Sequence, residues 1–410
     1  MNKSITIISL NYHPEDTAIG LYSTQMAEYL QKLGWNITVI TGFPYYPKWE
    51  ISKDYKNKKI FIEEDHNGIK ILRYKQFVPK NPSFIKRIFH IIDFTLGSTF
   101  NTKKIKQTDI VLSVIPFTSS AWLGKNLAKR INAKHWIHIQ DFEFDVALES
   151  GISSNNSLMK FLSKRLFNFE RKLLDSADIV STISYGMIEK LKKKSNSKTY
   201  YFPNWIDNDT IDPLKAKQHN YMSGDKFKIL YSGNIGAKQD WSLFLRVTDY
   251  FKENDQIEFI IVGNGSNKHK LIEQTKGFKN VKHFDPVPLK ELNNLLCSAD
   301  LHLLFQKGDV VDTVMPSKVL GMMASEVPSL VTGNQNSEVA KLFKLYNLGY
   351  FYKSSDFRLV TKKIKNMIFK KEEGLEIGKH AREHVISSFS GKIILDNFEE
   401  KLRQINEIKN

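Results

Sequence analysis

The sequence predicts an α/β protein of two domains, each with a parallel sheet covered by helices on both faces. Short apolar runs alternate with stretches of helical periodicity along the chain, which is the pattern of a parallel sheet with helical crossovers. The alternation restarts after a segment rich in Pro, Asn and Asp at 200–215. The length of 410 residues also exceeds the size at which a single core keeps growing.

Composition limits the class of protein. The hydrophobic fraction of 41% and the aromatic fraction of 12% indicate a globular protein with ample core. The single cysteine, Cys297, excludes an internal disulfide framework and a zinc site with several cysteines. No apolar run reaches the roughly 18 residues of a membrane-spanning helix, and we expect no signal peptide. These features favour a protein of the reducing cytoplasm.

The charge is unusual, because 60 Lys and Arg against 44 Asp and Glu give a formal net charge of +16. Such an excess favours contact with polyanions, either nucleic acid or an anionic membrane face. An AT-rich genome, which supplies many lysines, would give the same excess without a function. The chain shows no aromatic–basic pattern of an RNA-recognition domain.

The first half of the chain is expected to form one domain, residues 1–205. Its β-rich runs predict strands, and the stretches between them have helical periodicity. The expected strands are 4–10, 36–41, 59–63, 69–74, 109–114, 134–139 and 178–183, and the expected helices are 20–33, 83–98, 118–131, 157–175 and 185–194. The segment 200–215 is the expected linker.

The second half repeats this pattern over residues 214–390. The expected strands are 227–233, 257–263, 281–284, 301–305 and 329–333, the helices between them are 239–251, 266–276, 288–297 and 316–325, and a charged helical tail covers 377–408. Open parallel sheets bind ligands at the carboxyl ends of their strands. Two such sheets facing each other would share one cleft, lined by the loops that follow the strands.

Two expected helices combine apolar side chains with basic ones. The segment 80–106 has a broad apolar face with Lys86 and Arg87 beside it, and the segment 157–174 is similar. Both patterns suit a helix that lies in a membrane interface with its lysines toward anionic headgroups. Both equally suit a half-buried helix, and for the second segment we favour the core.

Two loops of the second half are suited to a diphosphate and its nucleotide. In "SGNIGAKQDW", Gly233 and Gly236 permit close backbone approach, the next helix offers free N–H groups, and Lys238 adds a charge. In "GNGSNKHKL", Gly263 and Gly265 mark a strand-to-helix turn against which a planar base would lie. The alternative for each loop is a plain glycine-bearing turn.

A third loop adds a second lysine. In "VMPSKVLGMMASEVPSL", Pro316 suits the first turn of a helix, and Ser317 and Lys318 lie beside it. The N-terminus of that helix would point at an anion. Lys238 and Lys318 are therefore expected to converge on one pyrophosphate from two loops.

Polar residues also follow a strand of the first half, in "WIHIQDFEFD". His138, Gln140, Asp141 and Glu143 lie at or beyond its end. A histidine and carboxylates there are natural partners for sugar hydroxyls and candidates for a general acid or base. Alternation places His138 and Gln140 on one side and Asp141 on the other. A buried, hydrogen-bonded histidine is the alternative.

The connection after the first strand is longer than a tight structural turn. It runs from Asn11 through Pro14 to Gly20 and carries His13 and Glu15 before its helix begins. A long loop that ends in a helix cap is the plain interpretation.

Eight motifs occur in order along the chain: "NYHPEDTAIGLYSTQMAEYL", "TGFPYYPKWEI", "VPKNPSFIKR", "HIQDFEFD", "FPNWID", "YSGNIGAKQ", "IVGNG" and "MPSKVLGMMAS". Together they resemble the bacterial family 4 glycosyltransferases, and in particular those of colanic acid, O-antigen and capsule biosynthesis, including fucosyl- and N-acetylfucosaminyltransferases. The resemblance implies the GT-B fold of two Rossmann-like domains. It also implies retaining transfer from a nucleotide-diphospho-sugar, with no essential metal and no other cofactor.

The resemblance also implies roles for single residues. The donor, a UDP- or GDP-sugar, would be bound by Gly20, Gly233, Asn234, Gly236, Lys238, Gly263, Gly265, Pro316, Ser317 and Lys318. Glu15, His138, Asp141 and Lys238 are the catalytic candidates, and His13, Gln140 and Glu143 are the acceptor-side candidates. The closing helix of this fold, here 391–410, would pack back on the first domain.

One position departs from the family. Many members carry two glutamates in a Glu-x7-Glu pattern, the second of which contacts the ribose, and this chain has Thr313 and Gly321 there. No carboxylate is therefore assigned to the ribose, and Asp312 is the candidate substitute.

The expected acceptor is a sugar on polyprenyl diphosphate. Residues 83–98 would then contact an anionic membrane, at the inner face of the cytoplasmic membrane. A nucleotide-sugar epimerase or a glycan phosphorylase of the same fold stays open, as does a nucleic-acid-binding protein, although we expect no nucleic-acid partner.

Overall fold

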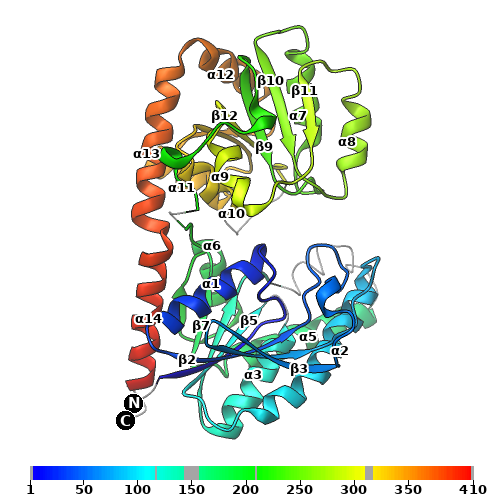
Figure 1. Cartoon of the computed structure of the whole chain (residues 1–410), viewed down its shortest axis with the longest axis vertical. Helices are drawn as coiled ribbons and strands as arrows, with labels where there is room; N and C mark the ends of the chain where they lie inside the picture. The colour runs from blue at the N-terminus through cyan, green and yellow to red at the C-terminus, as the bar shows by residue number, and fades with distance from the viewer. Residues whose placement is uncertain (1–2, 116–117, 143–156, 208–209, 310–316, 408–410) are drawn as a thin grey trace. The chain divides into compact units, whose positions relative to one another are not determined.

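The computed structural model describes residues 3–115, 118–142, 157–207, 210–309 and 317–407. The chain divides into two compact units. Unit 1 contains Met1–Phe202 and Leu395–Asn410, and unit 2 contains Pro203–Ile394. Each unit is built around a mainly parallel sheet with helices on it (Figure 1), so the α/β class expected from the sequence is confirmed.

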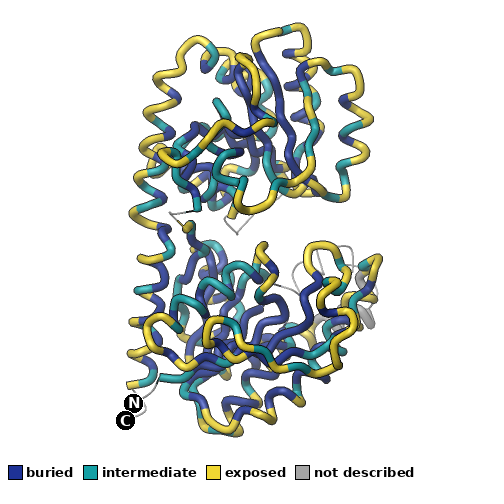
Figure 2. The backbone as a smooth tube through the Cα atoms, viewed as in Figure 1, coloured by how far each residue is buried: buried dark blue, intermediate teal, exposed yellow. Residues whose placement is uncertain are grey.

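The sheet of unit 1 has the strand order β3-β4-β2-β1-β5-β6-β7-β8. Its strands are β1 (Ser4–Ile8), β2 (Asn36–Gly42), β3 (Phe61–His66), β4 (Ile69–Tyr74), β5 (Ile110–Ile115), β6 (Lys134–Ile139), β7 (Ile179–Thr182) and β8 (Thr199–Tyr201). The central strands are apolar and buried along nearly their whole length, as parallel strands covered on both faces must be. Figure 2 shows these strands in the buried colour and the outer helix faces as exposed.

Helices cover this sheet. They are α1 (Ala18–Lys32), α2 (Phe84–Lys104), α3 (Thr118–Ile131), α5 (Ser157–Leu174), α6 (Tyr185–Lys194) and α14 (Gly391–Glu407), of which the last enters unit 1 at its second turn. Helix α3 contacts both α2 and α5. Helix α2 begins with an N-cap, because the Ser83 hydroxyl accepts a hydrogen bond from the Lys86 backbone N–H.

At one edge the structure adds an antiparallel pair to the expected parallel sheet. Strand β3 runs antiparallel to β4, whereas the other paired strands of both sheets run parallel. Asn67 and Gly68 connect the two strands with φ values of 53° and 79°. Positive φ at both positions is the requirement of a tight hairpin turn, and Asn-Gly is its strongest sequence signal.

Helix α14 packs on unit 1, far from the rest of that unit in sequence. Phe398 stacks on Phe202 with ring centres 4.2 Å apart and lies edge-on to Trp136 at 4.9 Å. Trp35 donates from its indole nitrogen to Glu399 at 2.9 Å. The last helix thus completes the core of the first unit.

The sheet of unit 2 has the order β11-β10-β9-β12-β13-β14. Its strands are β9 (Phe227–Ser232), β10 (Ile257–Val262), β11 (Val281–Phe284), β12 (Leu301–Phe305), β13 (Ser329–Gly333) and β14 (Tyr350–Lys353). Its helices are α7 (Trp241–Tyr250), α8 (Lys268–Gln274), α9 (Leu289–Cys297), α10 (Ser317–Ala324), α11 (Glu338–Tyr346), α12 (Phe357–Phe369) and α13 (Lys371–Phe389). One continuous apolar core joins these layers.

Several elements were not expected from the sequence. Strand β8 lies partly inside the segment taken as a linker, and α11, β14 and α12 were not assigned. The expected single tail helix is two helices, because Ser390 between them adopts extended backbone angles (φ −65°, ψ 142°). Short, half-buried elements such as β14 carry little periodicity of their own.

The packing of α14 leads to a testable prediction about stability. Phe398→Ala removes a fully buried ring from the core of unit 1 and should lower its free energy of unfolding by about 3 kcal/mol or more. Urea denaturation monitored by circular dichroism measures the change. Asn397→Ala, an exposed substitution on the same helix, is the matched control and should change stability little. Equal stability of the two variants would contradict the packing role of α14.

Candidate active site

The two glycine-bearing loops of unit 2 pack on each other at the carboxyl edge of the sheet. A Cβ on Gly263 would lie 2.0 Å from the carbonyl oxygen of Gly233, and one on Gly265 would lie 2.5 Å from Oδ1 of Asn234. Gly233 and Gly265 also have positive φ values of 136° and 156°. The first role of these glycines is therefore to let the loops after β9 and β10 touch, which leaves the donor contacts predicted for them as predictions.

Lys318 joins the same edge from the first turn of α10. Its ammonium group donates to the Tyr231 hydroxyl at 3.2 Å and lies 4.8 Å from the centre of that ring. A Cβ on Gly233 would be 3.4 Å from the same nitrogen. Burial raises the pKa of Tyr231 far above its usual value, so the hydroxyl stays neutral. The structure thus places a cation directly beside the backbone of Gly233.

Ser317, the first residue of α10, is exposed. Helix N-termini carry a partial positive charge and unpaired N–H groups, so the start of α10 and the Lys318 ammonium add to one another at this edge. Pro316 lies outside the described residues.

Lys238 is exposed on a loop whose backbone is fixed. The Gly236 N–H donates to the Gln239 side chain at 3.1 Å, and the Trp241 indole donates to the Gly236 carbonyl at 2.9 Å. Within the part of the chain that the structure describes, the Lys238 ammonium makes no ion pair. A rigid loop with an unengaged cation at its surface is suited to an anionic ligand.

The start of α7, where free N–H groups were expected, is capped in part. The Asp240 carboxylate accepts from the Leu243 N–H at 3.0 Å, so one of these N–H groups is engaged. An acid at that end opposes an anion there. The positive groups of this edge are therefore the two lysines and the start of α10.

In unit 1, Glu15 is a buried carboxylate that holds the loop after β2. It is 6% exposed. Its Oε1 accepts from the backbone N–H groups of Tyr45 and Tyr46 at 2.7 and 2.8 Å, and its Oε2 accepts from the Asn11 amide at 2.7 Å. Burial raises the pKa of Glu15, and these hydrogen bonds oppose the rise.

Gly20 belongs to the same arrangement, because a Cβ there would lie 2.8 Å from the Cβ of Glu15. The structure therefore gives Gly20 a packing reason and Glu15 an anchoring one. Their donor-binding and catalytic roles stay predictions.

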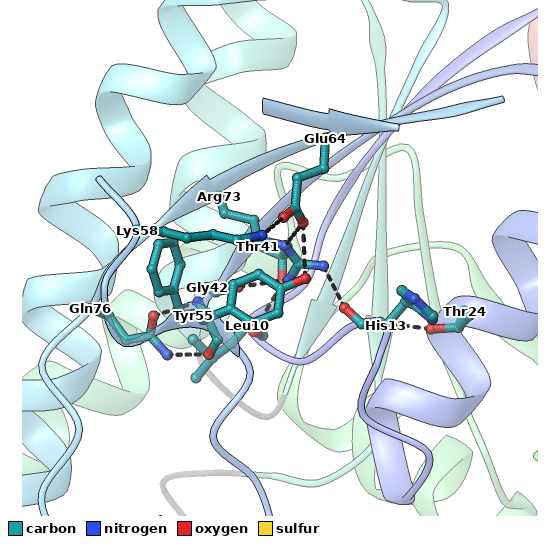
Figure 3. Close-up of polar contacts among 11 residues, drawn as sticks. Leu10, His13, Thr24, Thr41, Gly42, Tyr55, Lys58, Glu64, Arg73 and Gln76 are labelled. Atoms are coloured by element: carbon teal, nitrogen blue, oxygen red, sulfur yellow. Dashed lines mark hydrogen bonds and ion pairs between the residues drawn. The ribbon is translucent and has the colours of Figure 1, made fainter. Parts of the chain in front are cut away.

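Arg73 is the second buried charge at this edge (Figure 3). It is 1% exposed. Its guanidinium donates to Glu64 at 2.6 Å, to the Gly42 carbonyl at 3.0 Å and to the His13 carbonyl at 2.5 Å. It also lies over the Tyr55 ring, 5.1 Å from the ring centre. Arg73 thus ties the hairpin β3–β4 to the loops after β1 and β2.

His13 is held in the loop after β1. Its ring stacks on His66 with centres 3.7 Å apart, and its backbone N–H donates to the Thr24 hydroxyl at 2.9 Å. Burial, followed by the neighbouring His66 and Arg73, lowers the pKa of His13. A neutral imidazole at the strand end fits the predicted contact with sugar hydroxyls.

His138 lies on β6 and is 3% exposed. Its Nδ1 is 2.9 Å from the Ser181 hydroxyl, and its Nε2 is 2.9 Å from the Gln140 amide nitrogen, which donates to it. Burial lowers the pKa of His138 to about 3, so the ring is neutral at pH 7. These are the features of the buried, hydrogen-bonded alternative, and the catalytic role of His138 stays a prediction.

Two acidic candidates follow β6. Asp141 is half-buried and accepts from the Phe142 N–H at 2.9 Å. Glu143 lies outside the described residues. The structure therefore brings together His138 with Gln140, and His13 with Glu15 and Gly20, as separate groups on the same sheet edge.

Sequence reasoning missed Arg73. The residue lies on the same face of β4 as Ile69 and Ile71, both of which are buried. An arginine on the buried face of a strand needs paired acceptors. Its spacing of two and four residues from the apolar Ile71 and Ile69 was the signal that would have identified it.

Among the described residues, no group of three or more His, Cys, Asp or Glu side chains is arranged to hold a metal ion. No described helix is long and apolar enough to cross a bilayer.

Comparison with known proteins was made on the sequence and on the structure. The family described as "Glycosyl transferases group 1" matches residues 214–384. A protein of Escherichia coli K12 described as colanic acid biosynthesis glycosyl transferase WcaI is 32% identical over 356 residues, which are 83% of this chain and 86% of that protein.

Two solved structures have the same fold at low identity. Sucrose-phosphate synthase from Thermosynechococcus elongatus has a TM-score of 0.73 and 14% identity, with 98% of this chain and 99% of that one covered. HepE from Anabaena in complex with UDP-glucose has a TM-score of 0.67 and 11% identity, again over 98% and 99% of the chains.

The buried Glu15 gives a testable prediction. Glu15→Ala leaves the buried Tyr45 N–H and the partly buried Tyr46 N–H without their acceptor and should lower the free energy of unfolding by about 2 kcal/mol. Glu15→Gln keeps an acceptor oxygen for both N–H groups, and Asn11 can turn its amide to match, so most of the stability should remain. Urea denaturation measures both variants. A Gln variant as unstable as the Ala variant would contradict the anchoring role.

Proposed function

The chain belongs to the group 1 glycosyl transferases with the GT-B fold, and from this premise we propose which donor and acceptor its two sheet edges bind. It is a transferase enzyme. The donor is a nucleotide-diphospho-sugar, a UDP- or GDP-sugar of the fucose or N-acetylfucosamine type. The acceptor is a sugar carried on polyprenyl diphosphate, and the product is a unit of a surface polysaccharide.

One observation carries the donor half of this proposal. The Lys318 ammonium lies against the Gly233 backbone at the start of α10, where a parallel sheet binds its ligands. Lys238 is exposed on the loop that connects β9 to α7. Two cations and a helix N-terminus at one edge suit a diphosphate, and HepE, a protein of the same fold, was solved with UDP-glucose.

The chemistry follows from these charges. In the transfer, the anomeric C–O bond of the donor breaks and the diphosphate leaves with the electron pair. Lys238, Lys318 and the N–H groups at the start of α10 stabilise the charge that develops on it. The acceptor hydroxyl bonds to the same face of the anomeric carbon, so configuration is retained, and its proton passes to the leaving phosphate. No metal or other cofactor takes part in these steps.

The acceptor half rests on unit 1. The neutral His13 and the Gln140 amide lie at the carboxyl edge of its sheet and are suited to hydrogen-bond sugar hydroxyls. The similarity to WcaI, described as a colanic acid biosynthesis transferase, supports a surface polysaccharide as the product.

Membrane contact through residues 83–98 fits this acceptor. Helix α2 buries one face against the rest of unit 1. His90 and Phe94, on this face, have no exposed surface. Its opposite face is apolar and between 41% and 64% exposed, and consists of Ile85, Ile88, Phe89, Ile92, Leu96 and Phe100. Lys86, Lys103 and Lys104 are exposed on the same helix.

A 21-residue helix with an apolar stripe about 22 Å long and a cationic margin is suited to lie in the headgroup region of an anionic bilayer. We therefore place the enzyme at the inner face of the bacterial cytoplasmic membrane, bound through α2. A nucleic-acid partner is not needed to account for the positive charge of this helix.

Replacement of the phosphate-stabilising lysine tests the donor site. Lys238→Ala should lower turnover about a hundredfold or more, since it removes one group that stabilises the leaving diphosphate. Because Lys238 is exposed, the free energy of unfolding should not change. The assay measures UDP or GDP released from a panel of nucleotide sugars, with a synthetic lipid-linked sugar as acceptor.

Lys307→Ala is the matched control for this experiment. Lys307 is also exposed, and its backbone N–H donates to the Lys238 carbonyl at 3.1 Å, so it removes a charge next to the site without removing the proposed contact. Near-normal turnover of Lys238→Ala, or an equal loss in Lys307→Ala, would contradict the assignment.

The membrane contact has its own test. A variant with Ile85→Ser, Phe89→Ser and Leu96→Ser should bind vesicles that contain phosphatidylglycerol at least about tenfold more weakly than the wild type, because it loses apolar area that enters the bilayer. Co-sedimentation measures the partition. Replacing Leu345, Leu359 and Leu375, which are equally exposed in unit 2, by serine is the control. Binding unchanged in the first variant, or lost to the same degree in the control, would rule out α2 as the contact.

A further inference from the structure

The loop after β2 presents a rigid aromatic surface at the carboxyl edge of unit 1. Residues 43–52 form this loop. Its backbone is held by the Glu15 carboxylate at Tyr45 and Tyr46, and the Ser52 N–H donates to the Pro44 carbonyl at 2.8 Å. These hydrogen bonds tie the backbone of the loop at Pro44, Tyr45, Tyr46 and Ser52.

Trp49 occupies a strained position in this loop. Its φ is 54°, in the left-handed region that a bulky aromatic residue rarely adopts. Such strain persists only where the surroundings impose it, and it concentrates at binding and catalytic sites. The indole packs edge-on to Tyr45 at 5.3 Å and lies 5.7 Å from the His90 ring, so its orientation is fixed.

Arg87, in the first turn of α2, lies on this indole. Its guanidinium carbon is 5.1 Å from the ring centre. The residue is exposed, and within the described ranges its guanidinium makes no ion pair. A guanidinium held against an aromatic face keeps its planar fork oriented, so it loses little freedom when it binds a phosphate with two hydrogen bonds.

The charges around this pair are favourable to an anion. Glu50, the neighbour of Trp49, is bound by Lys56 at 2.6 Å. Lys56 lowers the pKa of Glu50, and Lys80 and Lys48 lower it further. The Glu50 carboxylate is therefore paired, and Lys48, Lys56 and Lys80 lie near enough to act on it.

We propose that Trp49 and Arg87 bind the diphosphate of the lipid-linked acceptor, with the guanidinium contacting phosphate oxygens and the indole holding the guanidinium. This rests on the proposed function, because it assumes a diphosphate-linked acceptor. Arg87 lies in the first turn of the helix whose apolar stripe is proposed to meet the bilayer, so the diphosphate of an embedded lipid would lie near this end of α2. The donor's diphosphate is assigned to other residues, in unit 2.

The test measures binding of geranyl diphosphate to the full chain by isothermal titration calorimetry, with geraniol as the phosphate-free comparison. Arg87→Ala should weaken geranyl diphosphate binding about tenfold or more, since hydrogen bonds to charged groups are worth about 1.5–3 kcal/mol. Arg87→Lys should weaken geranyl diphosphate binding less than Arg87→Ala does. The affinity of Trp49→Phe should lie between that of Arg87→Lys and that of the wild type. Geraniol binding should not change in any of these variants.

Lys129→Ala, which removes an exposed charge from α3 of the same unit, is the matched control and should bind like the wild type. Saturating UDP or GDP should not displace geranyl diphosphate. Failure of the wild type to bind it, equal affinity in Arg87→Ala, or displacement by the nucleotide would each overturn the proposal. Nucleotide-sugar binding, measured separately in the same proteins, should stay unchanged in Arg87→Ala. Its absence in the wild type would contradict the proposed function instead.

Discussion

The carboxyl edge of unit 1 depends on two buried, oppositely charged side chains that hold the same pair of loops. Arg73 donates to the carbonyl groups of His13 and Gly42. Glu15 accepts hydrogen bonds from the N–H groups of Tyr45 and Tyr46, which follow Gly42 in the loop after β2. Both side chains are nearly without contact to solvent, and an unpaired charge there would cost several kcal/mol. The loops after β1 and β2 are therefore confined to the relative position that satisfies both charges, and this position decides where His13 and Trp49 stand.

Unit 2 reaches the same result with small residues instead of buried charges. The loops after β9 and β10 touch because neither Gly233 nor Gly263 has a side chain to separate them. Only then can Lys318 lie along the backbone of Gly233 while it donates to Tyr231. One unit thus fixes its loops by hydrogen bonds to ionised groups, and the other by close backbone contact that leaves room for a cation.

The sequence predicted the layers better than the loops. Apolar periodicity and the restart after residue 200 were sufficient for two α/β halves, because burial of a strand on both faces leaves a direct mark on composition. Apolar periodicity was not sufficient to predict the hydrogen-bond partners of Glu15. Tyr45 and Tyr46 donate to Glu15 through backbone N–H groups, which nearly every residue possesses. The buried environment of His138 has the same origin, because Ser181, its partner, comes from a strand distant in sequence. Contacts of this kind exist only once the strands are side by side.

Helix α14 has a consequence for biosynthesis. Phe202 leaves the ribosome 196 residues before Phe398, the ring that stacks on it. At about 5–20 residues per second, that interval is roughly 10–40 s. For this time the nascent first unit exposes the apolar surface around Trp136 and Phe202 to solvent and to chaperones. The folding of unit 1 can finish only after unit 2, which lies between its two segments in sequence, has been translated. Unit 2 can therefore fold before unit 1 is complete.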